Sequence, residues 1–242
     1  MGRAPGRDRR AVPLLSHAPP ARRPLRFRTE DAYGLLLADI VLTFLVFAQI
    51  DPARWSRLVL APAVGSMLLL SLYASHARPR LMRGAAIGVG VAFVIVLCEA
   101  ILDTDAFAGS AYAIYGLLLV LSPAVIINRI LRHPEVTVST ILGAICAYLL
   151  IGMVFGFLYA MMGRIDSRPF FESHPVVDQF DFFYFSYASL TTVGFGDFVS
   201  RGDLGRGLSV LEAAFGQIFL VTLIARLVSL FGRPRGRASD AD

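Results

Sequence analysis

The sequence contains no lysine, little charge and only two cysteines. All 23 basic residues are arginine, which we interpret as the codon bias of a GC-rich bacterial genome. Charged residues make up 17% of the 242 residues, hydrophobic residues make up 56%, and the mean hydropathy is +0.63. A soluble protein needs more polar side chains than this to cover its surface. The composition therefore predicts an integral membrane protein.

The scarce cysteines and histidines exclude several kinds of site. Cys98 and Cys146 lie inside apolar runs, so they form neither a disulfide framework nor a CxxC pair, and we interpret them as packing residues. The histidines lack the spacing of a metal site; they are His17, His76, His133 and His174. The net charge of +5 does not indicate a nucleic-acid partner, because the arginines flank apolar segments and no binding motif accompanies them. We expect no cofactor and no nucleic-acid partner, and the sequence indicates no soluble partner.

Long apolar runs predict an all-α integral membrane protein with six transmembrane helices. Their approximate ranges are residues 33–50, 57–75, 82–102, 110–131, 137–162 and 207–231. Residues 1–32 are rich in arginine and lack the continuous apolar core of a signal peptide. We expect them to form a disordered cytoplasmic tail, and residues 232–242 to form a second, short cytoplasmic tail.

The placement of arginine predicts the orientation in the membrane. Seventeen arginines fall near the two chain ends and in the loops at 76–83 and 128–136, whereas six fall on the other side. Cytoplasmic segments are the ones enriched in basic residues. We therefore expect both termini to be cytoplasmic in a multi-pass protein of the cell membrane.

Two carboxylates and one pair of glycines stand out within the apolar runs. Asp39 and Glu99 are costly to place in lipid, which makes them candidates for function. Each lies within about two turns of a predicted helix end, so a structural role, facing water or paired with arginine, is the alternative. The spacing of Gly152 and Gly156 predicts a close approach of another helix.

The stretch between the fifth and sixth predicted helices differs from the rest. Asp178 and Asp181 place negative charge at the start of a helix that runs to about Leu190, some 12 residues or ~18 Å, which is too short to cross a membrane. The sequence TTVGFGD, residues 191–197, follows at once. Non-helical backbone at membrane depth must be buried in protein or line water. We therefore expect a re-entrant segment that dips into the membrane and returns.

The alternation of glycine with larger residues in this segment predicts a path for ions. Gly194 and Gly196 permit backbone angles that other residues disfavour, and their alternation with Val193 and Phe195 can direct successive carbonyl groups to one side. Four such strands around an axis would form rings of carbonyl oxygens that replace the hydration shell of a monovalent cation. The hydroxyl group of Thr192 could supply a further ring. Because one chain supplies one strand, we expect a fourfold homotetramer.

Residues 192–197, TVGFGD, match the signature of pore-loop potassium channels. The whole arrangement resembles the prokaryotic members of that family that have six helices and a single pore loop, with the close resemblance confined to about residues 178–230. It implies a pore domain at residues 134–231, made of an outer helix, a pore helix, a selectivity filter and an inner helix. Residues 33–133 would then form a peripheral domain of four helices.

The resemblance also implies roles for individual residues. Potassium would bind in the selectivity filter, residues 192–196, through the backbone carbonyls of Thr192, Val193, Gly194 and Phe195. Asp197 would form the outer mouth and brace the filter. Gly216 would be a gating hinge in the last helix, with a plain packing role as the alternative. The supporting residues of the pore helix would be Tyr184, Tyr187 and Thr191.

Two departures from the family pattern bear on these expectations. Voltage-gated relatives carry arginine at every third position of the fourth helix, whereas residues 110–128 contain none, so we expect no voltage sensor of that kind. Some members have a glutamate four residues before the filter threonine, where it supports the aspartate. Ala188 occupies this position here.

Three alternatives to a passive potassium-selective channel fit parts of the pattern. A nonselective monovalent cation channel would use the same segment with less selective carbonyl sites. An intramembrane aspartyl protease has a GxGD string, which residues 194–197 also form, and needs a second carboxylate such as Asp39 or Asp103. The segment could also be a re-entrant turn in a transporter. We expect the channel and no enzymatic activity, since Asp197 follows a helix too short to span and precedes a polar stretch.

Overall fold

The computed structural model describes residues 29–49, 54–102, 108–132, 137–165, 168–174 and 177–231. Within these ranges the secondary structure is helical, apart from an isolated β-bridge between Phe171 and Ser200. The parts of the predicted tails at 1–28 and 232–242 lie outside the described residues, as do Asp103, His17 and His133.

Six long helices and one short helix make up the described chain. The long helices coincide with the six apolar runs but are longer than predicted, with 21 to 29 residues instead of 18 to 26, and the short helix α6 has 12. The first helix begins at residue 29 rather than 33, and the last begins at 203 rather than 207. The elements are α1 (Thr29–Gln49), α2 (Arg54–Ala74), α3 (Pro79–Leu102), α4 (Ala108–Arg132), α5 (Val138–Ile165), α6 (Gln179–Leu190) and α7 (Asp203–Phe231).

Five of the long helices are long and apolar enough to cross a membrane, so the chain is a multi-pass membrane protein. They are α1, α3, α4, α5 and α7. The sixth predicted span coincides with α2, whose apolar part covers only Ala61–Ala74.

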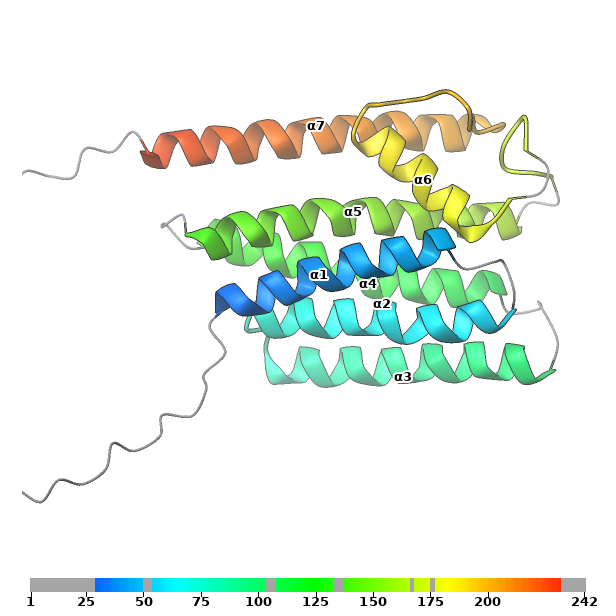
Figure 1. Ribbon diagram of the computed structural model, residues 1–242, viewed down its shortest axis with the longest axis horizontal. Helices are drawn as coiled ribbons and strands as arrows, with labels where there is room; N and C mark the ends of the chain where they lie inside the picture. Colours follow the sequence, from blue (N-terminus) through cyan, green and yellow to red (C-terminus); the bar gives the residue numbers. More distant parts are fainter. Residues whose placement is uncertain are drawn as a thin grey trace, which may run out of the picture.

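The long helices lie side by side in a bundle (Figure 1). Helix α5 packs against α1, α4 and α6, and α6 lies tilted between α5 and α7. The start of α1 and the end of α7 lie at the same end of the bundle, and the chain between α6 and α7 arches over the opposite half (Figure 1). The chain has six long helices, an even number, so it finishes at the end of the bundle from which it started.

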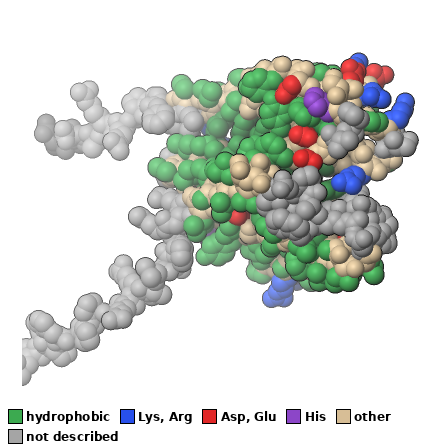
Figure 2. Space-filling model, turned by 45° about the vertical axis from the view of Figure 1, so that its right-hand side comes forward, with side chains coloured by type: hydrophobic (Ala, Val, Ile, Leu, Met, Phe, Trp, Pro, Cys, Tyr) green, Lys and Arg blue, Asp and Glu red, His purple; other side chains and the backbone are tan. Residues whose placement is uncertain are grey.

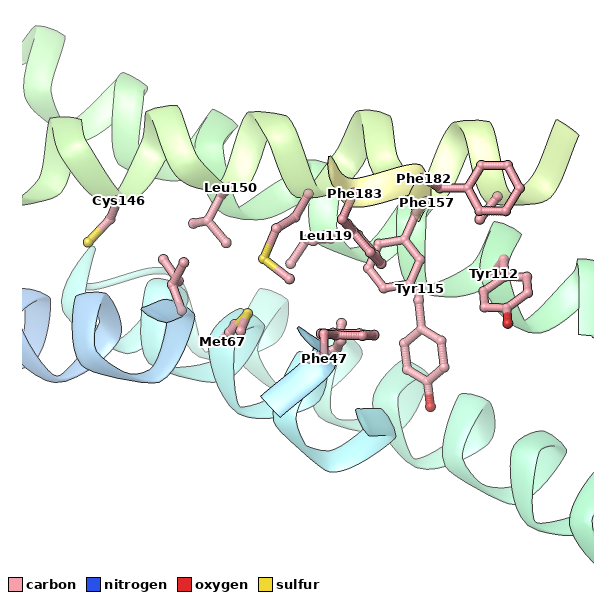
Figure 3. Packing of buried hydrophobic residues seen from close by; sticks show 14 of the residues in the cluster. Phe47, Met67, Tyr112, Tyr115, Leu119, Cys146, Leu150, Phe157, Phe182 and Phe183 are labelled. Carbon is pink, nitrogen blue, oxygen red and sulfur yellow. The ribbon is translucent and has the colours of Figure 1, made fainter. Parts of the chain in front are cut away.

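Aromatic rings fill the interior where α1, α5 and α6 meet (Figure 3). Phe157 of α5 meets Phe183 of α6 edge to face, with ring centroids 5.0 Å apart and planes at 88°. Phe47 of α1 lies 4.9 Å from Phe183 on the other side. Tilted and edge-to-face ring pairs of this kind stabilise beyond the area that they bury. The short helix is therefore anchored in the core by its own aromatic side chains.

Glycines in α5 let α6 approach closely, which confirms the prediction made from their spacing. A Cβ atom at Gly156 would lie 2.3 Å from Cδ1 of Phe183, and one at Gly152 would lie 2.7 Å from Cε1 of Tyr187. Real Cβ atoms do not approach other heavy atoms this closely. The two rings therefore rest directly on the backbone of α5.

Polar contacts join the helices of the α1–α4 group. Ser66 of α2 donates a hydrogen bond of 2.8 Å to the carboxylate of Asp39, so this residue has a serine partner. Glu99 is buried on α3, beside Tyr115 of α4. Both carboxylates thus face neighbouring helices.

Helix α7 shares few surfaces with the rest of its own chain. In its apolar span 11% of the residues are buried, compared with 50% in α5. Near its end, Arg226 reaches across to the carboxyl end of α4 and donates to the carbonyl oxygen of Ile130 at 2.6 Å. Hydrophobic side chains also cover much of the bundle face in Figure 2. Most of α7 therefore faces outward from the chain that carries it.

We predict that the close packing of α5 on α6 makes Gly156 intolerant of a methyl group. Gly156→Ala should lower the free energy of unfolding by about 1–3 kcal/mol, because the backbone or Phe183 must shift to make room. Thermal unfolding in detergent, followed by circular dichroism, measures the change.

Gly90 of α3 is a matched control, since nothing lies within 4 Å of a Cβ atom built there. Gly90→Ala should leave the protein as stable or stabilise it by about 0.5–1 kcal/mol through helix propensity. Equal effects of the two substitutions would contradict the packing of α6 on α5.

Candidate functional site

The short helix α6 begins at an acidic turn and buries one face. The backbone N–H of Asp178 donates to the carboxylate of Asp181 at 2.7 Å, which satisfies a donor at the helix start. Phe182, Phe183 and Ser186 are buried against the neighbouring helices. At ~18 Å the helix is too short to cross a membrane.

Side chains of α5 and of α6 itself hold the carboxyl end of α6. The hydroxyl of Tyr148 donates to the carbonyl oxygen of Leu190 at 3.1 Å, and that of Tyr187 donates to Leu149 of α5 at 2.7 Å. Thr191 donates twice to the carbonyl of Tyr187, from its backbone N–H at 3.0 Å and from its hydroxyl at 2.6 Å. Tyr187 and Thr191 therefore fix the point where the chain leaves the helix.

The backbone beyond this point alternates in handedness. Thr192, Gly194 and Gly196 have φ angles of 57°, 54° and 80°, whereas Val193 and Phe195 have negative φ. Such alternation turns every second peptide group, which is the condition for carbonyl groups to point to one side. For threonine a left-handed conformation costs roughly 1–2 kcal/mol. The sequence pattern flagged the two glycines for positive φ and missed Thr192.

Two further backbone hydrogen bonds tie this segment to α6. The N–H of Thr192 donates to the carbonyl of Ser189 at 2.9 Å, and the N–H of Gly194 donates to Ala188 at 3.1 Å. The segment thus folds back along the end of the helix that precedes it. This arrangement satisfies backbone donors that would be costly to leave unpaired.

Asp197 and Tyr184 form the outer part of the site. The Tyr184 hydroxyl donates to the Asp197 carboxylate at 2.8 Å, and the backbone N–H of Phe198 donates to its other oxygen at 3.0 Å. The Tyr184 ring also stacks on Phe195, with centroids 6.1 Å apart and planes at 8°. Tyr184 lies one turn before Ala188, the position where the family resemblance would place a glutamate. The hydrogen bond to Asp197 therefore comes from Tyr184 here.

These hydrogen bonds set the ionisation of Asp197. Desolvation raises the pKa of Asp197, but the hydrogen bonds from Tyr184 and from Phe198 outweigh it, so the pKa lies below the ordinary value. The same bond to Asp197 raises the pKa of the Tyr184 hydroxyl. Asp197 is therefore an exposed, ionised carboxylate at neutral pH.

Helix α7 packs against the end of the segment at Thr192. The side-chain amide of Gln217 donates to the hydroxyl of Thr192 at 3.1 Å. A Cβ atom at Gly216 would lie 2.3 Å from the carbonyl oxygen of Leu190, so α7 touches the end of α6 at this glycine. This contact gives Gly216 a packing role, and its role as a hinge stays a prediction.

Much of the surface of the segment is open. The side chains of Val193 and Phe195 are 54% and 71% exposed. Nothing lies within 4 Å of a Cβ atom built at Gly194 or Gly196. The described part of the chain therefore leaves free space beside these four residues.

The loop after Asp197 is fastened to the connection between α5 and α6. The backbone N–H of Glu172 donates to Val199 at 3.0 Å, and that of Arg201 donates to Phe170 at 2.8 Å. Glu172 also forms an ion pair with Arg206 at the start of α7. These contacts hold the segment at both ends.

Comparison with known proteins identifies this region. A family model described as "Ion channel" matches residues 143–233, from α5 through α6 and the 191–197 segment to α7. This part of the chain is thus similar to ion channels, as its resemblance to pore-loop potassium channels predicts. No curated protein and no solved structure matches the chain. The channel region thus comprises α5, α6 and α7, and α1–α4 lie outside the match.

The channel region contains a buried carboxylate that the sequence analysis missed. Glu212 of α7 is fully buried; it accepts a hydrogen bond of 2.8 Å from the Tyr159 hydroxyl and also contacts Ser186. Its signal was the one that marked Asp39 and Glu99, a carboxylate inside an apolar run. Gln217 was missed as well, because only the crossing of α7 over the segment shows that it meets Thr192.

The carboxylates considered for a protease have separate partners. Asp39 of α1 binds Ser66 of α2, whereas Asp197 binds Tyr184 of α6. Asp103 lies outside the described residues. The facing pair of aspartates that such an enzyme needs is not found among the residues described.

We predict that Tyr184 keeps Asp197 ionised. Tyr184→Phe retains the ring that stacks on Phe195 but removes the hydrogen bond to the carboxylate. The pKa of Asp197 should therefore rise, and its protonation on acidification should occur at higher pH than in the wild type. NMR titration of the labelled aspartate carboxyl carbons in lipid nanodiscs measures this shift.

Tyr73→Phe is a suitable control, because Tyr73 is exposed at the far end of α2. Its titration curve for Asp197 should match the wild type. An unchanged Asp197 titration in Tyr184→Phe would show that the 2.8 Å contact does not stabilise the carboxylate.

Proposed function

We propose that the chain forms a passive, potassium-selective channel and works as a homotetramer in the cell membrane. The observation that carries this proposal is the alternating φ of Thr192, Gly194 and Gly196 in the segment between α6 and Asp197. That segment lies within the residues that match the ion channel family. Ions would pass along the carbonyl oxygens of residues 192–195.

Coordination by backbone carbonyls is the basis of the proposed selectivity. A potassium ion leaves its hydration shell only where enough oxygen atoms replace it, and rings of carbonyl groups do so. Thr192, Val193, Gly194 and Phe195 would each supply one carbonyl per subunit, and the Thr192 hydroxyl would add an inner ring. The hydrogen bond from Gln217 would orient this hydroxyl.

The open surfaces support assembly with other copies of the chain. A single chain contributes one strand, so a closed path around the ion needs a ring of subunits, and four is the number proposed. The exposed side chains of Val193 and Phe195 would then pack between subunits. So would part of the apolar surface of α7, whose exposed large side chains are Leu204, Val210, Leu211, Phe215, Ile218, Val221, Ile224 and Val228.

The charges around the segment favour a cation. The carboxyl end of α6 leads directly into Thr192, and the helix dipole places partial negative charge there. At the other end, the ionised carboxylate of Asp197 makes the mouth negative. Both ends of the path would thus attract a cation and repel an anion.

Gating by an arginine-based voltage sensor is not part of the proposal. In the described part of α4 the basic residues are Arg129 and Arg132, both in the last turn. Arg129 donates to the carbonyl of Ala74 and to His76, and Arg132 donates to Asn128. These arginines bind groups at helix ends. There they would lie near one face of the membrane, where the field across the bilayer has little effect on them.

The decisive measurement is the reversal potential of protein reconstituted in planar bilayers with potassium on one side and sodium on the other. We expect a reversal potential at which the sodium side is strongly positive, because potassium permeates far better than sodium. A current indifferent to the two ions would establish a nonselective cation channel, and the absence of current would refute the channel.

Gly194→Ala should abolish or strongly reduce potassium selectivity, because alanine disfavours φ of 54° by roughly 1–2 kcal/mol in each subunit. Gly202→Ala is the matched control in the same connection, where the space for a Cβ atom is open and φ is not in the left-handed region. It should conduct as the wild type does. If the two variants were equally selective, potassium selectivity would not depend on the alternating φ angles of this segment.

The proposed assembly predicts that truncation of two exposed side chains, Phe215 and Leu117, affects the stability of the tetramer differently. Phe215→Ala should weaken the tetramer by a few kcal/mol, since phenylalanine buried in an interface is costly to remove. Leu117→Ala on α4, whose side chain is 74% exposed, should leave it intact. Native mass spectrometry on a temperature series measures tetramer dissociation. Monomers in the wild type would refute the tetramer.

A further inference from the structure

Glu212 lies where the three helices of the channel region meet. Its side chain is fully buried, and its neighbours are Tyr159 of α5 and Ser186 of α6. A buried ionised carboxylate is costly unless a cation and several hydrogen-bond donors surround it. Whether Glu212 is ionised therefore depends on the cations and hydrogen-bond donors around its side chain.

No cation faces Glu212 within the described residues. The arginines of α7 have other partners, since Arg206 pairs with Glu172 and Arg226 binds the carbonyl of Ile130. The titratable groups that act on Glu212 from the helices around it are tyrosine hydroxyls, which carry no positive charge. They are Tyr148 and Tyr159 of α5 and Tyr187 of α6.

The hydrogen atoms around Ser186 decide the protonation of Glu212. The Ser186 hydroxyl oxygen lies 2.6 Å from the carbonyl oxygen of Gly152 and 2.5 Å from Oε1 of Glu212. A hydroxyl has one hydrogen, and a carbonyl oxygen can only accept. If Ser186 donates to Gly152, the contact with Glu212 is a hydrogen bond only when Glu212 itself donates. An ionised Glu212 would leave two acceptors competing for one hydrogen.

We infer that Glu212 is a neutral carboxylic acid that positions α6, and with it the proposed filter. The hydrogen bonds run in one direction, from Tyr159 to Glu212, from Glu212 to Ser186 and from Ser186 to Gly152. They link α7 to the middle of α6 and both to α5. This role deepens the proposed function and rests on it, because α6 carries the segment at residues 191–197.

The same face of α7 touches α6 at a second point. Gly216 lies four residues after Glu212, which places both on one side of a helix, and it meets the carbonyl of Leu190. Loss of the proton from Glu212 removes its hydrogen bond to Ser186 and places a negative charge among groups that cannot compensate it. Helices α6 and α7 then separate along this face, and the segment loses its support.

The test of protonation uses infrared spectroscopy on the full-length protein in lipid. Glu212→Gln retains the pattern, since its amide N–H₂ can donate to Ser186 and its carbonyl can accept from Tyr159. We expect the wild-type minus Glu212→Gln difference spectrum at neutral pH to contain the C=O stretch of a protonated carboxyl group. Its replacement by carboxylate bands would overturn the inference.

The test of the positioning role compares pH profiles. A buried acid that is neutral in the folded state binds its proton more tightly than in the unfolded state, so its stabilising effect is lost as pH rises. Thermal stability and potassium current of the wild type should therefore fall at alkaline pH relative to Glu212→Gln, which should vary less. Glu99→Gln, a buried carboxylate outside the channel region, should retain the wild-type profile. Identical profiles for wild type and Glu212→Gln would overturn the role.

A third variant separates the positioning role from simple packing. Glu212→Ala should lose potassium current at every pH, while Glu212→Gln restores it, and wild-type current in Glu212→Ala would overturn the role. If no variant and no wild-type protein conducts potassium, the proposed function fails. The infrared and stability measurements then still decide the state of Glu212, because neither depends on conduction.

Discussion

Backbone that leaves helical structure at membrane depth must find partners for its N–H and C=O groups, and the arrangement of α5, α6 and α7 follows from this constraint. The N–H groups of Thr191, Thr192 and Gly194 turn back to carbonyls of α6. The carbonyl of Leu190 accepts from Tyr148 of α5. A helix of 12 residues can carry such a segment only if longer helices hold it in place on both sides.

The two long helices beside α6 hold it by different means. Helix α5 offers bare backbone, since Gly152 and Gly156 let aromatic rings of α6 lie against it. Helix α7 offers a polar contact through Glu212 and a second close approach at Gly216. Helix α5 also holds α6 by hydrogen bonds, since Tyr148 donates to Leu190 and Tyr187 donates to Leu149. Aromatic rings complete the packing toward α1, where Phe47 meets Phe183.

Much of this architecture could be predicted from the sequence, because apolar runs and glycine spacing are local signals. The six long helices, the short helix and the close approach at Gly156 were all predicted. The partners of Glu212 and Gln217 could not be predicted, since they depend on the angle at which α7 crosses α6. The left-handed conformation of Thr192 was also hidden, because the hydrogen bonds around it override the preference of threonine.

The hydrogen bond between Arg226 and Ile130 gives α7 the properties of a lever. Arg226 lies 23 residues after the start of α7, so roughly 35 Å of helix separates it from that end. A tilt of two degrees about that end would move it by about 1.2 Å, which is enough to stretch the 2.6 Å bond beyond hydrogen-bond distance. Any larger tilt must therefore carry the end of α4 along or break the bond. The α1–α4 group thus holds α7 near its carboxyl end, where a small rotation produces the largest displacement.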